Sequence, residues 1–141
     1  MTAGLRPAPH MAKTKNSIRW LEEPEPHNYP AALSYLCLIY PPRQAARIVA
    51  KLRTAPVVEF KAKDIFRASR LSLLGVSNSH IERDRKKIKQ GHGLSPILLV
   101  RDSVNGEVVI ADGYHRLCAV YSDAEDELIP AKICGCARGK E

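Results

Sequence analysis

The chain has 141 residues, of which 45% are hydrophobic, so it is long enough and apolar enough to bury the core of one domain. Its longest apolar run, residues 31–40, is about half the length of a membrane span, and no apolar stretch typical of a signal peptide follows the N-terminus, so we expect a cytoplasmic protein with reduced cysteines and no membrane partner. The net charge of +7 favours anionic partners such as nucleotides, phosphorylated small molecules or nucleic acid.

The N-terminal residues 1–28 are predicted to form a flexible basic arm. Apolar residues are sparse there, and four prolines interrupt the segment: Pro7, Pro9, Pro24 and Pro26. We expect disorder up to about Ser17, with Trp20 and Leu21 as the first anchored residues. The remaining residues, 29–141, are predicted to form a single domain.

Two helices are predicted next, separated by Pro41 and Pro42. The first would bury one face formed by Leu33, Leu36, Cys37 and Tyr40. The second would bury Ala45, Ile48, Val49 and Leu52. On its outer face, a basic stripe could meet an anion or simply be solvated: Arg43, Arg47 and Lys51.

The middle of the chain predicts a short strand at 57–60, a short helix at about 64–68 and a polar helix from Ser79 to about Gln90. The polar helix would bury only a thin apolar edge, through Ile81 and Ile88. Its other positions carry a run of cations: Arg83, Arg85, Lys86, Lys87 and Lys89. These cations could bind along the phosphates of a nucleic-acid backbone, or they could form a face that is only solvated.

The C-terminal third contains the clearest pattern. A buried-type strand over 96–100 and a return strand over 108–111 flank the turn pair Asn105-Gly106. A helix over 114–121 follows, and a last strand over 129–133 contains Pro130, which favours the edge of a sheet.

The step from the return strand into the helix is a candidate anion site. A strand that turns at once into a helix places the positive end of that helix at the edge of the sheet. Gly113 permits a positive φ, Arg116 can form two parallel hydrogen bonds to phosphate oxygens, and His115 adds a donor. Asp112 could hold Mg²⁺. Alternatively, Asp112 caps the helix and Arg116 pairs with a carboxylate such as those in 123–127.

These motifs resemble the ParB N-terminal domain superfamily, which also contains sulfiredoxin. The phosphate-binding pattern Gly-x-x-Arg-x-x-Ala is matched by Gly113, Arg116 and Ala119, with Tyr114 inside it. The resemblance covers about residues 56–134 and leaves the N-terminal helical pair outside. It implies an α+β fold in which a small mixed β-sheet is flanked by helices.

The resemblance also narrows the chemistry. Sulfiredoxins carry a reactive cysteine where this chain has Tyr114, so sulfiredoxin activity is not expected. Chromosome-partitioning ParB proteins continue into DNA-binding and dimerisation domains, which we do not expect here, and no carboxylate cluster suggests a ParB-like nuclease. The free-serine kinases of this fold have a step similar to residues 112–116 and use an upstream carboxylate, for which Asp64 and Glu59 are the nearest candidates.

The sequence therefore predicts a nucleotide-binding protein, an NTPase or a small-molecule phosphotransferase, with Mg²⁺ and ATP, ADP or CTP. The predicted phosphate-binding residues are Gly113, Tyr114, Arg116 and Ala119. The predicted catalytic residues are Asp112, His115 and Asp64, with Asp112 also as metal ligand. The alternatives are a DNA- or RNA-binding accessory protein without catalysis and a partner-binding module. A zinc site from His115, Cys118, Cys134 and Cys136 is a minor possibility.

Overall fold

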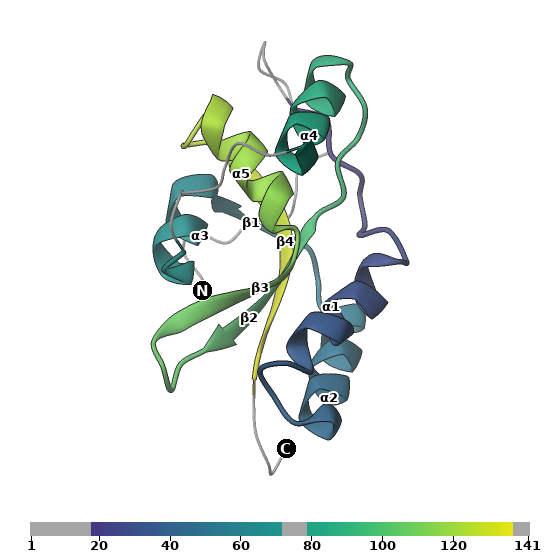
Figure 1. Ribbon diagram of the computed structural model, residues 1–141, viewed down its shortest axis with the longest axis vertical. Coiled ribbons are helices and arrows are strands. Elements are labelled where there is room, and N and C mark those ends of the chain that lie inside the picture. Colours follow the sequence, from purple (N-terminus) through teal and green to yellow (C-terminus); the bar gives the residue numbers. More distant parts are fainter. Residues whose placement is uncertain (1–17, 72–78, 137–141) are drawn as a thin grey trace.

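The computed structural model describes residues 18–71 and 79–136 (Figure 1). In chain order the elements are α1 (Asn28–Leu36), α2 (Pro42–Thr54), β1 (Val58–Lys61), α3 (Ala62–Ser69), α4 (Ser79–Lys89), β2 (Ile97–Asp102), β3 (Glu107–Asp112), α5 (Tyr114–Asp123) and β4 (Leu128–Gly135). The four strands form one mixed sheet, so the predicted α+β class is confirmed.

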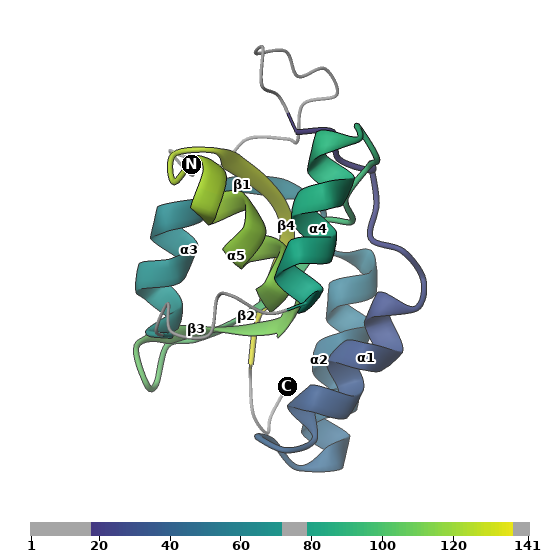
Figure 2. The ribbon, with the colours of Figure 1, turned by 45° about the horizontal axis from the view of Figure 1, so that its top comes forward.

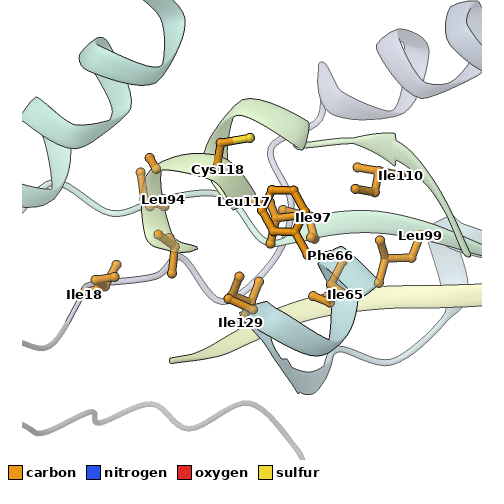
Figure 3. Close-up of a cluster of buried hydrophobic side chains, with 14 of the residues drawn as sticks. Ile18, Ile65, Phe66, Leu94, Ile97, Leu99, Ile110, Leu117, Cys118 and Ile129 are labelled. Atoms are coloured by element: carbon orange, nitrogen blue, oxygen red, sulfur yellow. The ribbon is translucent and has the colours of Figure 1, made fainter. Parts of the chain in front are cut away.

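The sheet has the strand order β1-β4-β2-β3 and separates two apolar clusters. β4 pairs antiparallel with β1 and parallel with β2, and β2 pairs antiparallel with β3. On one face, α3, α4 and α5 bury a cluster that includes Phe66, Ile97 and Leu117 (Figure 3). On the other face, α1 and α2 bury Leu36 and Leu52 against the sheet (Figure 1). The predicted N-terminal helical pair therefore completes the second layer.

Local sequence signals place several element ends correctly. α2 begins at Pro42, and α4 ends where Gly91 adopts a φ of +76°. There the N–H of His92 bonds to the carbonyl of Lys87 at 2.9 Å and the N–H of Gly91 bonds to that of Ile88 at 3.1 Å, which is a Schellman motif. Among the described residues, no helix is both long and apolar enough to cross a membrane.

The predicted buried face of α1 is confirmed at Leu36 and wrong at Cys37, and Leu33 and Tyr40 pack against the core only partly buried. The structure buries Tyr29, Ala32 and Leu36, whereas Cys37 is exposed and Leu33 only partly buried. The helix ends at Leu36, so the apolar residues that follow it belong to the connection to α2. Because α1 packs on both α2 and β3, tertiary contacts select the buried face.

The prediction that β4 lies at the edge of the sheet is also wrong, since β4 is central. Pro130 lies opposite Glu59 of β1, and the ladder to β2 begins one residue later, at Ala131. Pro130 therefore interrupts no rung between β4 and β2, and the sheet tolerates it inside.

The predicted arm is too long, because residues 18–27 contact the domain. Ile18 is 4% exposed within the core, and Trp20 forms a bridge with Leu94. The N–H of Leu21 donates to the carbonyl of Leu94 at 2.8 Å, and the N–H of Leu94 donates to that of Arg19 at 2.9 Å. These bonds fix the segment that leads into α1 alongside the loop that leads into β2.

Alanine substitutions at a buried and an exposed leucine should have different effects on stability. Leu117 is fully buried, so Leu117→Ala should lower the free energy of unfolding by about 2–5 kcal/mol and the Tm by at least about 6 °C. Leu38 is 83% exposed, so Leu38→Ala should change stability by less than about 0.5 kcal/mol. Urea and thermal unfolding measure both, and equal losses would contradict this account of the core.

The hairpin between β2 and β3 predicts a pH-dependent contribution from Asp102. Hydrogen bonds, first from the side chain of Asn105 at 2.9 Å, hold the pKa of Asp102 below its ordinary value. The stabilisation is therefore complete above the unfolded pKa of about 3.9 and is lost as the pH falls through the lower folded pKa. Asn105→Ala should cost about 1 kcal/mol at neutral pH and less near pH 2.5 in urea titrations. Gln90→Ala, at the exposed end of α4, is the control and should show no such dependence.

Candidate functional site

The turn between β3 and α5 is fixed by Gly113. This residue is the N-cap of α5, with φ 110° and ψ 13°. A Cβ at Gly113 would lie 2.7 Å from Cβ of Ile97 and would collide with its Cγ2 atom, so the turn packs directly on β2. No side chain caps the N-terminus of α5 by a hydrogen bond, and the positive end of that helix faces the same region.

Arg116 lies in the first turn of α5, beside this glycine. Its Nη2 atom is 3.1 Å from Oδ2 of Asp112 and 3.4 Å from the carbonyl oxygen of Pro96. The side chains of Arg116 and Asp112 are only 16% and 18% exposed. The Nε of Arg116 is buried and has no hydrogen-bond partner. Asp112, and not the carboxylates of 123–127, is therefore the partner of Arg116, and the guanidinium retains donor capacity.

An open cavity of about 260 Å³ lies over this turn. It is bordered by the segment before α1, by α4, by the loop before β2 and by the N-terminus of α5, and Figure 2 shows α4 alongside α5. Its lining residues are Glu25, His27, Arg83, Asp84, Lys87, Gly93, Leu94, Ser95, Asp112, Gly113, Tyr114, His115 and Arg116. The structure thus brings the predicted residues 112–116 together with two cations of the polar helix.

Charges of both signs line the cavity. The cations are Arg83, Lys87 and Arg116. The carboxylates are Glu25, Asp84 and Asp112. Because these six formal charges cancel when both lining histidines are neutral, an anionic ligand would depend on direct hydrogen bonds from the arginines more than on the net field.

The N-terminal side of the cavity rests on a buried polar contact that the sequence did not reveal. Ser95 and Asn28 are each 3% exposed, and the hydroxyl of Ser95 donates to Oδ1 of Asn28. The N–H of Glu25 donates to Oγ of Ser95 at 3.0 Å. This contact places Glu25 and His27 at the cavity. The only sequence signal for Glu25 is its position between two prolines.

Two of the predicted site residues lie outside the cavity. Asp64 is on α3, where its side chain is 55% exposed and pairs with Arg67 at 3.5 Å. Ala119 is fully buried in the core, so its place in the motif reflects packing against the sheet and not contact with a ligand. Glu59, the other candidate carboxylate, is buried in β1 at the opposite edge of the sheet from β3.

The predicted nucleic-acid run divides between two directions. Arg83 and Lys87 line the cavity. Arg85 instead faces α5, where its Nη2 is 3.6 Å from Oδ1 of Asp123, and Lys86 and Lys89 are exposed. Helix α4 therefore contributes Arg83 and Lys87 to the cavity, whereas Lys86 and Lys89 lie outside it and are exposed to solvent.

Tyr114 lines the cavity as a neutral phenol. Burial is the main cause that raises its pKa to about 12, with a side-chain hydrogen bond to Cys118 adding to the effect. Burial likewise raises the pKa of Cys118, which is fully enclosed in the core.

The zinc ligands considered from the sequence do not come together, because Cys118 lies in one apolar cluster whereas Cys134 and Cys136 pack on the cluster at the opposite face of the sheet. Across residues 18–71 and 79–136 no group of three or more His, Cys, Asp or Glu side chains is placed to hold a metal ion.

No family model, no curated protein and no solved structure matches the chain.

The close approach at Gly113 predicts the outcome of a matched pair of substitutions. Gly113→Ala should cost about 2–4 kcal/mol of stability, because the added Cβ meets Ile97, which is fully buried, and the backbone is left-handed. Gly135→Ala adds a Cβ with nothing within 4 Å, so its change should stay within about 1 kcal/mol. Thermal unfolding of both variants measures the difference, and similar Tm values would refute the proposed packing of the turn.

Proposed function

We propose that the cavity over the Gly113 turn binds a nucleotide through its phosphates. The observation that carries this proposal is the convergence, in one cavity, of a left-handed glycine, a helix N-terminus with no side-chain cap, and Arg116. A helix N-terminus and a neighbouring arginine are the groups that proteins use to bind phosphate. Arg83 and Lys87 of α4 line the same cavity and supply further cations.

Arg116 would gain a further partner when phosphate binds. At present Nη2 bonds to Asp112 and to a carbonyl oxygen. A phosphate oxygen in the cavity would accept from the terminal N–H groups of the guanidinium that Asp112 and Pro96 do not use. Asp112 would keep the guanidinium oriented, since the arginine has five N–H donors and can serve both partners.

Mg²⁺ would accompany the nucleotide and not occupy a separate protein site. Asp112 is the carboxylate beside the phosphate position, and one carboxylate with phosphate oxygens and water is a usual donor set for this ion. The donor set therefore fits a shared site. When bound, the ion would neutralise charge on the phosphates.

A bound nucleoside triphosphate would allow hydrolysis or transfer to a small hydroxyl compound. In either reaction a carboxylate would accept the proton of the attacking hydroxyl while a new P–O bond forms and the bond to the diphosphate breaks. Asp112 and His115, predicted as catalytic, line the cavity, and so do Glu25 and Asp84. Asp64 is displaced from this role by its position on α3.

The proposal predicts a ligand-dependent thermal shift that depends on Arg116. One of ATP, ADP, CTP or GTP with Mg²⁺, at 100 times its Kd, should stabilise the wild type by about 2.7 kcal/mol, a shift of several degrees. Arg116→Ala should abolish the shift, and Arg116→Lys, which keeps the charge but loses the fork, should weaken binding at least about tenfold. Arg101→Ala, on the exposed side of β2, is the control. No shift with any nucleotide in the wild type would refute the proposal.

Substitutions on helix α4 distinguish nucleotide binding from binding of nucleic acid. Replacing Arg83 and Lys87 together with alanine removes two charges from the cavity, whereas replacing Lys86 and Lys89 removes two from the exposed side. Nucleotide binding should weaken only with the first pair. Loss of binding to DNA or RNA with the second pair, together with a steep dependence on salt, would instead support the accessory-protein function.

A further inference from the structure

The strand β3 lies at one edge of the sheet. It pairs with β2 on one side, and no other strand of the described residues pairs with its outer side. In Figure 1 the hairpin of β2 and β3 projects at the margin of the sheet. A strand edge presents a row of backbone N–H and C=O groups that can pair with an additional strand. Over the six residues of β3 this row is about 20 Å long.

A second cavity, of about 740 Å³, runs along this edge. Every residue from Glu107 to His115 borders it, so the cavity follows the whole length of β3 and the turn after it. Across from the strand, α1 contributes Ala31 and Tyr35, and the connection that follows it contributes Ile39. Ser69, the last residue of α3, and Leu71, which lies just beyond that helix, border the groove as well. The cavity is therefore a groove whose floor is a strand edge and whose sides are the ends of two helices.

Exposed apolar side chains gather around this groove. Tyr35, Ile39 and Leu71 line it and are each 45–47% exposed. Leu38, which precedes Ile39, is 83% exposed, and Val104, which precedes the lining residue Asn105, is 79% exposed. Among the described residues the remaining large exposed hydrophobic is Leu21, which contacts Gly93 near the other cavity. A concentration of exposed apolar groups at one place is typical of a surface that binds another polypeptide.

The charge of the groove is opposite to that of the protein. Its lining includes three carboxylates and no lysine or arginine: Asp102, Glu107 and Asp112. Asp112 pairs with Arg116, and Asp102 is 5% exposed and bonded to Asn105 and Tyr40, so Glu107 is the partly exposed carboxylate that a ligand can reach. Arg70, which precedes the lining residue Leu71, donates to the carbonyl of Gly106 at 3.3 Å. On a chain of net charge +7, this acidic apolar groove favours a basic ligand.

We propose that the β3 edge binds an extended basic segment of a partner polypeptide, which adds a strand to the sheet. Backbone hydrogen bonds would give the affinity, while the apolar sides and the carboxylate of Glu107 would select alternating apolar and basic side chains. A second copy of this chain fits less well. The β3 strand of a second copy carries no lysine or arginine, so it would supply no basic side chain to Glu107.

This inference goes beyond nucleotide binding and does not depend on it. The two cavities share residues 112–115, so the test leaves these residues unchanged. Glu107 borders only the groove and is partly exposed, and Ile39 lies in the connection after α1. Substitutions at these two positions therefore alter the groove without altering the phosphate site.

The test selects binders from a phage-displayed library of random 12-residue peptides on the full chain, with counter-selection on the variant Glu107→Lys. Enriched sequences should alternate apolar residues with lysine or arginine. One such peptide, synthesised with a fluorescent label and titrated by anisotropy, should bind the wild type at least tenfold more tightly than it binds Glu107→Lys or Ile39→Asp. Glu22→Lys makes the same charge change at an exposed position outside the groove and should leave the affinity unchanged.

Three outcomes would overturn the proposal. The first is a library that yields no sequences enriched over the Glu107→Lys counter-selection. The second is a selected peptide whose affinity drops equally with Glu22→Lys. The third is concentration-dependent dimerisation of the wild type in sedimentation, lost in Ile39→Asp, which would assign the groove to a second copy. Thermal unfolding of each variant confirms that it is folded before binding is measured.

Discussion

The contact between Gly113 and Ile97 is the constraint on which the site depends. The left-handed backbone at Gly113 lets β3 turn into α5 directly against β2, in a space too small for any other side chain. That turn brings the N-terminus of α5 to the end of the sheet and fixes Arg116 within reach of Asp112. Both cavities border the same turn, so one close backbone contact positions the proposed phosphate site and one end of the groove along β3.

Around this turn the chain uses buried polar contacts to bring distant segments together. Ser95 and Asn28 join the loop before β2 to the start of α1, and Lys132 of β4 donates to the carbonyl of Arg53 at 2.9 Å while lying 3.3 Å from Glu23. Lys132 is 3% exposed, so these partners offset the cost of burying its charge. The segment before α1 is thereby tied to both the sheet and the cavity that it borders.

Short-range signals predicted most elements of the fold, because spacing and turn residues act within a few positions. The periodicity of α2, the glycine after α4 and the turn pair Asn105-Gly106 all correspond to the structure. The errors concern partners that lie far along the chain. The buried face of α1 depends on α2 and β3, and the central place of β4 depends on where its ladder to β2 begins relative to Pro130.

The sequence by itself determined the strand–helix step with Gly113 and Arg116, because a glycine that breaks a strand before a helix carries its conformational meaning locally. Only the tertiary structure decided what surrounds that step. It brought Glu25, Arg83 and Lys87 to one cavity, left Asp64 on another helix, and made Asp112 the partner of Arg116. These placements follow from helix packing and strand order, which bring together residues tens of positions apart. Local sequence patterns do not specify which distant residues will be in contact.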